Sequence, residues 1–147
     1  MTGIQQATGA DLAGVLELLR DSALPVDGLI EHRDTLLIAR DGEHIVGCAA
    51  VELYGEWGLL RSVAVAASTR GTGLGHALVN AAVNLACQRG VRALFLLTTT
   101  AENFFPRFGF ERVDRADIPE ALRQSVELTS ACPASAIVMR KHITVAV

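Results

Sequence analysis

The chain has 147 residues, of which half are hydrophobic and 20% are charged. This length and composition are typical of one folded domain with a packed core, so we expect residues 1–147 to form a single domain rather than a disordered chain. The formal net charge is −3 and no basic tract occurs, which argues against a protein that binds nucleic acid by neutralising phosphates.

The first half of the chain carries short strand and helix signals in turn. Residues 3–7 are a candidate strand, and Thr8 with Asp11 fits a capping box at the start of a helix. That helix has an apolar face at helical spacing, formed by Leu12, Val15, Leu16 and Leu19. A break at Pro25 and Gly28 precedes a helical turn at 29–32. The Asp41-Gly42 turn then joins two predicted antiparallel strands, 35–39 and 44–54.

The second half continues with a strand at 59–65, a glycine-rich loop and a long helix over 73–89 that ends at Gly90. The buried stripe predicted for this helix is Leu74, Leu78, Ala81, Ala82 and Leu85. Residues 93–98 are almost wholly apolar, as in a central strand that is covered on both faces. Further elements are predicted at 101–108 (helix), 110–113 (strand), 119–125 (helix) and 136–139 (strand). This order predicts a mixed sheet with helices on both faces.

The three cysteines, Cys48, Cys87 and Cys132, are widely spaced and form no Cys-x-x-Cys pair. This pattern argues against a disulfide framework and a structural zinc site, and it favours a reducing cytoplasm. Residues 1–10 hold no Lys or Arg, and no apolar run reaches the roughly 18 residues of a transmembrane helix. We therefore expect a cytoplasmic protein without a metal and without a membrane partner.

Three glycines at alternate positions, Gly71, Gly73 and Gly75, lie between a strand and the long helix. Such a loop lets the backbone approach a ligand and directs N–H groups at phosphate oxygens, so a pyrophosphate could bind despite the acidic charge. A P-loop is excluded because His76 stands where its lysine would be. A dinucleotide fingerprint is incomplete, because the spacing is Gly-x-Gly-x-Gly. The alternative is that the glycines serve only as turns.

Two segments resemble landmarks of the GNAT superfamily of acyl-CoA N-acyltransferases. Residues 70–75, Arg-Gly-Thr-Gly-Leu-Gly, match its acetyl-CoA signature Arg/Gln-x-x-Gly-x-Gly/Ala, and residues 104–110 resemble its aromatic pair followed by x-x-x-Gly-Phe. The resemblance implies an α/β GNAT fold: a mixed, mostly antiparallel sheet, splayed between its fourth and fifth strands, with helices on both faces. It also implies acetyl-CoA as co-substrate and a small-molecule amine as acceptor.

Four segments point to particular members of this superfamily: residues 60–65, 96–101, 104–105 and 132–136. Together they look like the N-acetyltransferases of bacterial arsenic-resistance operons, and the Leu-Thr-Thr segment is also similar to the acetyltransferase domain of N-acetylglutamate synthases. Both imply acetylation of the α-amine of a small amino acid or of an arsenic-containing analogue. The alternatives are metabolic amino-acid acetylation like that of N-acetylglutamate synthase, or a non-catalytic acyl-CoA-binding module.

The resemblance implies that the backbone of Val63 and Val65 binds the pantetheine arm and that the glycine loop takes the pyrophosphate. Arg70 either adds a charged hydrogen bond or is a solvated loop residue, and His76 either approaches a phosphate or lies on the helix surface. The predicted cofactor-binding residues are Val63, Val65, Arg70, Gly71, Thr72, Gly73, Leu74, Gly75 and His76.

Catalysis requires a neutral amine, a stabilised oxyanion and a leaving thiolate. The Val63 N–H is the expected oxyanion donor. Many family members have a tyrosine where this chain has Phe105, and a phenyl ring cannot donate a proton, so Tyr54 or water must substitute, or the thiolate leaves unaided. Glu52 is the candidate general base and would act through a water molecule. The alternative is that Glu52 is only an exposed carboxylate on a strand. An α-amine needs less help than a lysine, since deprotonation near pH 7.4 costs about 1 rather than about 4 kcal/mol.

For the acceptor, Arg61 interrupts an apolar strand. Its guanidinium either binds the acceptor's carboxylate or forms an internal salt bridge with Glu52 or Glu56. Thr98 and Phe105 are the other predicted acceptor-binding residues, although threonines are also ordinary strand formers. We expect direct attack in a ternary complex without an acyl-cysteine, and a homodimer that pairs through residues 143–147.

Overall fold

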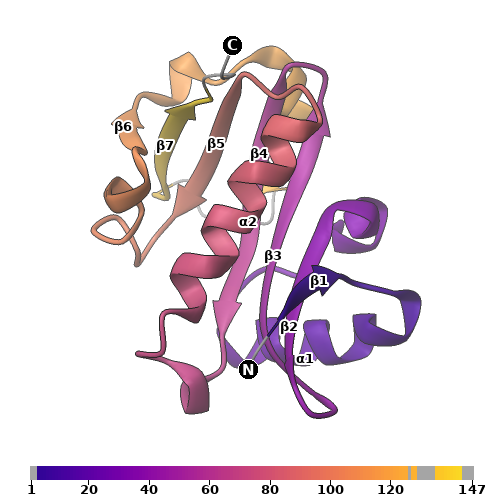
Figure 1. Ribbon diagram of the computed structural model, residues 1–147. Coiled ribbons are helices and arrows are strands. Elements are labelled where there is room, and N and C mark those ends of the chain that lie inside the picture. Colours follow the sequence, from indigo (N-terminus) through magenta and orange to yellow (C-terminus); the bar gives the residue numbers. More distant parts are fainter. Residues whose placement is uncertain (1–2, 126, 129–134, 144–147) are drawn as a thin grey trace.

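The computed structural model describes residues 3–125, 127–128 and 135–143. In these residues, seven strands form one sheet in the order β1-β2-β3-β4-β5-β7-β6 (Figure 1). The strands are β1 (Ile4–Gln6), β2 (Leu36–Asp41), β3 (His44–Tyr54), β4 (Trp57–Val65), β5 (Ala93–Thr98), β6 (Glu111–Val113) and β7 (Ile137–His142).

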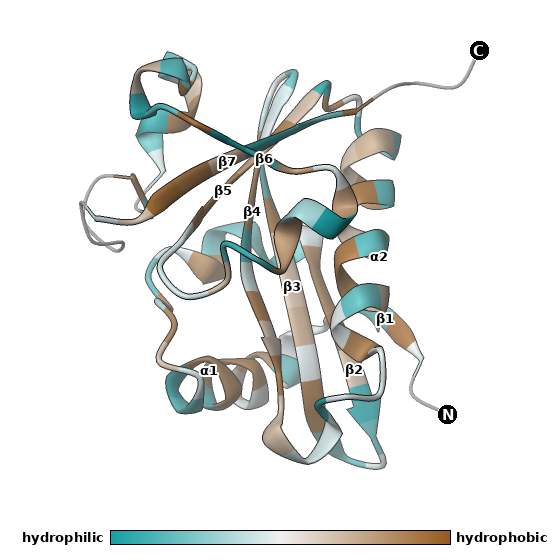
Figure 2. Ribbon diagram, turned by 90° about the vertical axis from the view of Figure 1, so that its left-hand side faces the viewer, coloured by the Kyte–Doolittle hydropathy of each residue, from teal (hydrophilic) through white to brown (hydrophobic). Residues whose placement is uncertain are grey.

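All neighbouring strands pair antiparallel except β4 and β5, which are parallel. Helix α1 (Leu12–Asp21) and helix α2 (Leu74–Gln88) cover opposite faces of the sheet (Figure 2). Neither helix, nor any other helix in the described part of the chain, has the length and apolar character needed to cross a bilayer. The predicted mixed α/β sheet of the GNAT type is confirmed.

The sheet opens between β4 and β5. Their register runs from the pair Trp57–Ala93 to the pair Leu60–Leu96, whereas β4 continues to Val65 and β5 to Thr98. The ends of the two strands therefore diverge after Leu60 and Leu96, as the splayed sheet requires. Backbone groups of β4 beyond this point face a space that β5 does not fill.

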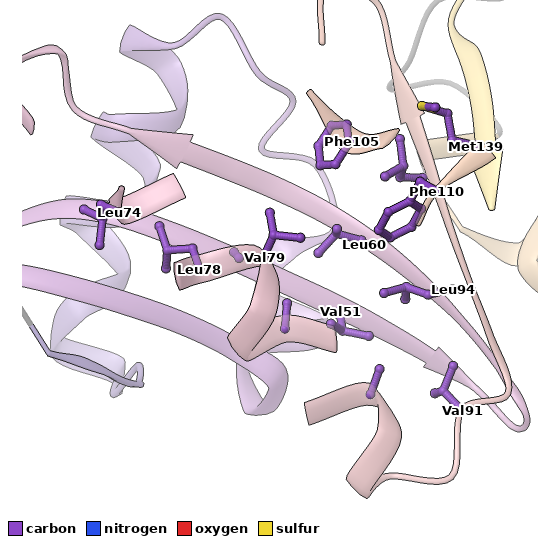
Figure 3. Packing of buried hydrophobic residues seen from close by; sticks show 14 of the residues in the cluster. Val51, Leu60, Leu74, Leu78, Val79, Val91, Leu94, Phe105, Phe110 and Met139 are labelled. Atoms are coloured by element: carbon purple, nitrogen blue, oxygen red, sulfur yellow. The ribbon is translucent and has the colours of Figure 1, made fainter. Parts of the chain in front are cut away.

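Apolar side chains pack in three clusters around the sheet. The largest lies under α2 and includes Leu60, Leu78 and Phe105 (Figure 3). A second cluster lies under α1, and a third under the segment around Ile118 and Leu122. The sheet is thus covered on both faces, which explains why β3 and β5 are apolar along most of their length.

The predicted buried faces of the two helices are confirmed in part, since Val15 and Leu19 of α1 and Leu74, Leu78 and Ala82 of α2 are buried. In α1, Leu18 is buried with Val15 and Leu19, while Leu12 and Leu16 are half-buried. In α2, Val79 and Ala86 are buried, while Ala81, Leu85 and Cys87 are half-buried. The cause of these differences is that both helices are apolar over more than one stripe, so contact with the sheet selects the face.

The remaining helical pieces are 3₁₀ turns: η1 (Gly9–Asp11), η2 (Leu29–Thr35), η3 (Ala67–Thr69), η4 (Phe105–Phe108), η5 (Arg115–Asp117) and η6 (Glu120–Gln124). The capping box of Thr8 and Asp11 is confirmed, with the Thr8 N–H 2.7 Å from an Asp11 carboxylate oxygen. The helix predicted over 101–108 is wrong in its first half, because Pro106 lacks the N–H that an α-helix begun at Ala101 would need for the carbonyl of Glu102. Cys132 and residues 144–147 lie outside the described residues.

Candidate functional site

The glycine loop leads from the end of β4, through η3, into α2. Gly71 and Gly73 have φ angles of +83° and +85°, a left-handed conformation that residues with a Cβ adopt only with strain. Gly75 lies within α2, and an added Cβ there would meet Phe104 Cζ at 3.5 Å and Val65 Cγ2 at 3.7 Å. Two of the three glycines are therefore required by the loop conformation, whereas at Gly75 a Cβ would make only ordinary contacts.

A cavity of about 590 Å³, which we name the loop cavity, lies beside this loop. All predicted cofactor-binding residues line it except Thr72, whose hydroxyl instead donates to the Thr69 carbonyl at 2.6 Å. The predicted residues that line it are Val63, Val65, Arg70, Gly71, Gly73, Leu74, Gly75 and His76. Since N–H groups at a helix start attract anions, the loop cavity suits a ligand with phosphate groups.

An aromatic wall closes one side of the loop cavity. Phe104 and Phe105 line it, with their ring centroids 5.2 Å apart, and the Arg107 guanidinium lies 5.7 Å from the Phe104 ring. The His76 ring lies 4.7 Å from the ring of Phe108. Phe104, Arg107 and Thr69 were not among the predicted cofactor-binding residues. The Phe104-Phe105 pair in the sequence was the signal that could have found the first two.

A second cavity, also about 590 Å³, opens between the diverging ends of β4 and β5, and we name it the slot cavity. It shares part of its wall with the loop cavity, so the two cavities lie side by side along the end of β4. The shared residues are Val63, Ala64, Val65, Arg70, Ala101 and Phe105. The predicted acceptor residues Arg61, Thr98 and Phe105 all line the slot cavity.

A β-bulge in β4 lies at the junction of the two cavities. The β3–β4 register passes from Ala50–Arg61 to Cys48–Ala64, so β4 holds one residue more than β3 over this interval. Ser62 has a φ of +58°, and its carbonyl accepts from the Cys48 thiol at 3.1 Å. Bulges disrupt the ladder locally and redirect the backbone. Here the bulge is followed at once by Val63, the predicted oxyanion donor.

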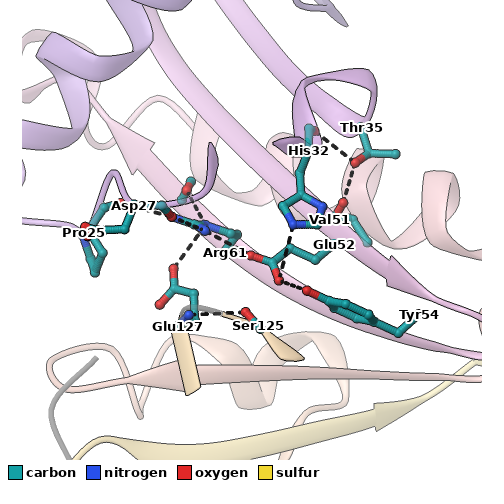
Figure 4. A network of polar contacts seen from close by, with 11 residues as sticks. Pro25, Asp27, His32, Thr35, Val51, Glu52, Tyr54, Arg61, Ser125 and Glu127 are labelled. Carbon is teal, nitrogen blue, oxygen red and sulfur yellow. Dashed lines mark hydrogen bonds and ion pairs between the residues drawn. The ribbon is translucent and has the colours of Figure 1, made fainter. Parts of the chain in front are cut away.

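A buried polar network surrounds Arg61 (Figure 4). The Arg61 side chain is 2% exposed, and Nη1 lies 2.9 Å from an oxygen of Glu52, which is fully buried. Nε lies 3.0 Å from an oxygen of Glu127, and Glu52 also accepts a 2.5 Å hydrogen bond from the Tyr54 hydroxyl. Of the two alternatives for Arg61, the structure shows the internal ion pair, with Glu52 rather than Glu56.

Glu52 and Tyr54 lie one layer behind the slot cavity, since Arg61 lines the cavity and they do not. The alternative of Glu52 as an exposed carboxylate is wrong, because the side chain is fully buried. Burial and the hydrogen bond to Glu52 raise the pKa of Tyr54 above its usual range, which makes its hydroxyl a weaker acid. Their predicted roles as base and acid stay predictions, and they would need a relay to reach the cavity.

Thr98 and Phe105 are held by the fold as well as exposed to the cavity wall. The Thr98 hydroxyl accepts from the Ala101 N–H at 2.9 Å, which fixes the turn after β5. Phe105 is 7% exposed, and its ring centroid lies 5.8 Å from that of Phe110. The sequence reasoning missed Glu127 and the loop around Pro25 and Asp27, which also line the slot cavity. No spacing rule connects these segments to β4, so only the fold reveals them.

Among the described residues, no group of three or more His, Cys, Asp or Glu side chains could hold a metal ion. The burial of Cys48 raises its pKa to about 12, so its thiol is neutral at ordinary pH. The site therefore combines a loop suited to phosphate groups, an adjacent slot cavity and a charged network beside that cavity.

Comparison with known proteins agrees with this architecture. The family model for the acetyltransferase (GNAT) domain matches residues 32–112, which is more than half of the chain. An amino-acid acetyltransferase of Ralstonia nicotianae is 33% identical over 132 residues, which cover 82% of this chain and 29% of that protein. An N-acetyltransferase of Chlorobaculum tepidum, CT2212, is 30% identical over 98 residues, covering 66% of this chain and 63% of that protein. The chain thus spans less than a third of the length of the amino-acid acetyltransferases it matches.

Solved structures share the fold. N-acetylglutamate synthase from Neisseria gonorrhoeae, complexed with coenzyme A and N-acetyl-glutamate, superposes with a TM-score of 0.83 at 20% identity, over 98% of this chain and 35% of that chain. Rv2747 from Mycobacterium tuberculosis, also solved with CoA, superposes with a TM-score of 0.82 at 20% identity, over 97% and 99% of the two chains. The chain belongs to the acetyltransferase (GNAT) domain family.

Proposed function

We propose that the protein transfers the acetyl group of acetyl-CoA to the α-amine of a small amino acid, by direct attack in a ternary complex. The observation that carries this proposal is that the loop cavity and the slot cavity are adjacent and share wall residues, among them Val63 and Phe105. One compartment suits a diphosphate and the other suits a small polar acceptor. The thioester would lie at their junction, within reach of both.

The donor would lie along β4 after the point where β5 diverges. Its amide-containing pantetheine arm can add to the open edge near Val63 and Val65, as a peptide adds to a sheet edge. The glycine loop would take the pyrophosphate, helped by the start of α2 and by Arg70. Each of these groups lines the loop cavity.

In the reaction, the neutral amine attacks the thioester carbon, a C–N bond forms and the C–S bond breaks. The amine nitrogen loses one proton, and coenzyme A leaves as a thiolate that takes one up. The Val63 N–H after the bulge would stabilise the oxyanion. Phe105 donates no proton, and unaided departure is tolerable because a thiol has a pKa of roughly 8.5.

The acceptor class is supported by the amino-acid acetyltransferases at 33% and 32% identity, which favour a free amino acid. Glutamate is the first candidate, since the synthase with the same fold was solved with N-acetyl-glutamate. An arsenic-containing amino-acid analogue rests only on the motif resemblance of residues 60–65, 96–101, 104–105 and 132–136. The cytoplasmic location and the homodimer belong to the same proposal, and a sizing column tests the dimer.

The test is acetyl-CoA-dependent thiol release with a panel of free amino acids, including L-glutamate, and their phosphinic and arsinic analogues. We expect turnover with at least one free amino acid and none with Nα-acetyl-lysine, whose remaining amine is a lysine amine. Alanine variants of Cys48, Cys87 and Cys132 should retain turnover, because direct attack forms no acyl-cysteine. Binding of acetyl-CoA without thiol release for any panel member would contradict the proposal and favour a non-catalytic module.

A further inference from the structure

We propose that the ion pair between Arg61 and Glu127 receives the charged head of the acceptor, and that Glu127 distinguishes the free amino acid from its N-acetylated product. The inference rests on the proposed function, because it assumes that the acceptor occupies the slot cavity. Both residues line that cavity. It adds a residue from the C-terminal part of the chain to the acceptor site and states what that residue recognises.

Arg61 has a partner on each of its three nitrogens. Nη1 donates to Glu52 at 2.9 Å and to the Asp27 carbonyl at 2.7 Å, and Nη2 donates to the Pro25 carbonyl at 3.3 Å. Nε lies 3.1 Å from the Ser62 hydroxyl and 3.0 Å from a Glu127 oxygen. An acceptor carboxylate that approaches Nε would therefore replace one of these partners.

We assign the replaceable position to Glu127. Glu52 is fixed in β3, is 0% exposed and is absent from the cavity wall, and it is held by Tyr54 as well. Glu127 is part of the cavity wall, on a segment outside the sheet, where its N–H lies 3.2 Å from the Ser125 hydroxyl. Its carboxylate meets Arg61 on the cavity side. It occupies the place that the carboxylate of an incoming amino acid would take.

The charges of the cluster explain why the acceptor must carry both a positive and a negative group. Two buried carboxylates, Glu52 and Glu127, both pair with Arg61, and Glu52 also lies 3.6 Å from Nε2 of His32. Separating a buried carboxylate from its cation without replacement is strongly unfavourable. A zwitterion avoids this separation, because its carboxylate binds Arg61 while its ammonium group binds Glu127. Every charge then keeps a partner, and the net charge of the cluster does not change.

The N-acetylated product lacks the positive charge of the acceptor. Acetylation turns the ammonium group into a neutral amide, which cannot compensate the Glu127 carboxylate. Glu127 then returns to Arg61 and displaces the product's carboxylate. The pairing with Glu127 belongs to the binding step, because the amine must be neutral when it attacks. The Arg61–Glu127 pair thus favours binding of the free amino acid and also favours release of the acetylated product.

The first experiment uses the wild-type protein saturated with coenzyme A. Calorimetry compares the panel amino acid with the highest turnover, L-glutamate being the first choice, with its N-acetyl derivative, its deamino acid and its decarboxylated amine. We expect each of the last three to bind at least about tenfold more weakly than the zwitterion, as the loss of one charged hydrogen bond predicts. Equal affinity for the deamino acid or for the N-acetyl derivative would overturn the proposal.

The second experiment uses Glu127→Gln, with Glu120→Gln in η6 as the matched control, since Glu120 is exposed and lies outside the cavity wall. In Glu127→Gln the Kd of the N-acetyl derivative should fall by about fivefold or more, while the Kd of the free amino acid stays or rises, since the product no longer displaces a charged group. If the Kd values of both ligands fall equally, Glu127 only blocks the site, and if both rise equally, its role is structural. Either result would overturn the proposal. Glu120→Gln should change neither Kd.

Failure of the two proposals can be told apart. If no panel member is acetylated, the proposed function fails and this inference fails with it. If acetylation proceeds but Glu127→Gln leaves the ratio of the two Kd values unchanged, only this inference fails. If Glu127→Gln does not fold, the wild-type comparison of the four ligands still decides.

Discussion

Arg61 shows what a single residue can and cannot reveal before the fold is known. A guanidinium in an apolar strand requires an anionic partner, and the sequence offered Glu52 on the neighbouring strand. The second partner, Glu127, comes from a segment far along the chain and meets Arg61 only after the sheet has formed. The need for a carboxylate was therefore predictable, whereas the presence of two was not. The consequence is that the acceptor meets a paired guanidinium rather than an open one.

Cys48 carries a prediction at the same scale. Its thiol is fully buried in β3 and donates to the Ser62 carbonyl, and burial raises its pKa to about 12 from an ordinary value of 9.0. Between these two values the unfolded chain loses the proton while the folded protein keeps it. The folded state thus binds more protons there, and the free energy of unfolding falls as the pH rises, by up to about 1.4 kcal/mol per pH unit for this one group.

Urea unfolding of wild-type protein and of Cys48→Ala, measured from pH 8 to pH 11, tests this effect. The wild-type free energy of unfolding should decrease more steeply above pH 9 than that of the variant. Tyr54 is common to both proteins and cancels in the comparison, although its raised pKa adds its own dependence at higher pH. Parallel curves would show that Cys48 ionises as readily in the folded protein as in the unfolded chain.

At the scale of elements, the passage from β4 into α2 carries a second prediction. Gly73 precedes the helix with a φ of +85°, whereas Gly75 is helical and an added Cβ would make only ordinary contacts of 3.5 and 3.7 Å. Gly73→Ala should therefore weaken coenzyme A binding and cost about 1 kcal/mol or more of stability. Gly75→Ala should fold like the wild type and lose less affinity, in keeping with the alanine that the resembled signature permits there.

Titration calorimetry with coenzyme A and urea unfolding of both variants provide the measurement. The expected order of affinity is wild type, then Gly75→Ala, then Gly73→Ala. The reverse order would mean that the space beside Phe104, rather than the loop conformation, limits binding. Equal affinities in all three proteins would show that the loop does not hold the nucleotide.

Elements differ in how far the sequence determines them. The strands and α2 were predicted within a few residues, because apolar alternation and glycine or turn signals mark their ends. The segment after β5 was misassigned, since aromatic residues at helical spacing also suit a turn that packs under α2. Most residues of the loop cavity were predicted from the contiguous segment 63–76, whereas Phe104 and Arg107 of its aromatic wall were not. The slot cavity draws on segments around Pro25, Thr98 and Glu127, which no local pattern connects.

At the scale of the whole molecule, the two parts of the sheet meet through four residue pairs between β4 and β5. A donor bound beyond these pairs would contact both β4 and the aromatic wall, and so it would join the two parts. Coenzyme A at one hundred times its Kd should stabilise the fold by about 2.7 kcal/mol and raise Tm by about 5–10 °C. A thermal unfolding scan followed by circular dichroism measures the shift.

Pantetheine, which lacks the diphosphate, is the matched control ligand and should give a smaller shift at the same concentration. No shift with coenzyme A would contradict donor binding in the adjacent cavities. An equal shift with pantetheine would place the binding energy in the arm along β4 and away from the glycine loop.

The bulge at Ser62 has a consequence for reading this strand. Leu60 packs into the cluster under α2, and so do Val63 and Val65, although an unbroken strand would put odd and even positions on opposite faces. The inside-outside alternation therefore changes phase by one step within β4. If inward and outward positions are counted by strict alternation from Trp57, every residue after Ser62 is assigned to the wrong face of the sheet. A sequence alignment that omits the extra residue of the bulge would likewise assign the wrong side chains to the slot cavity.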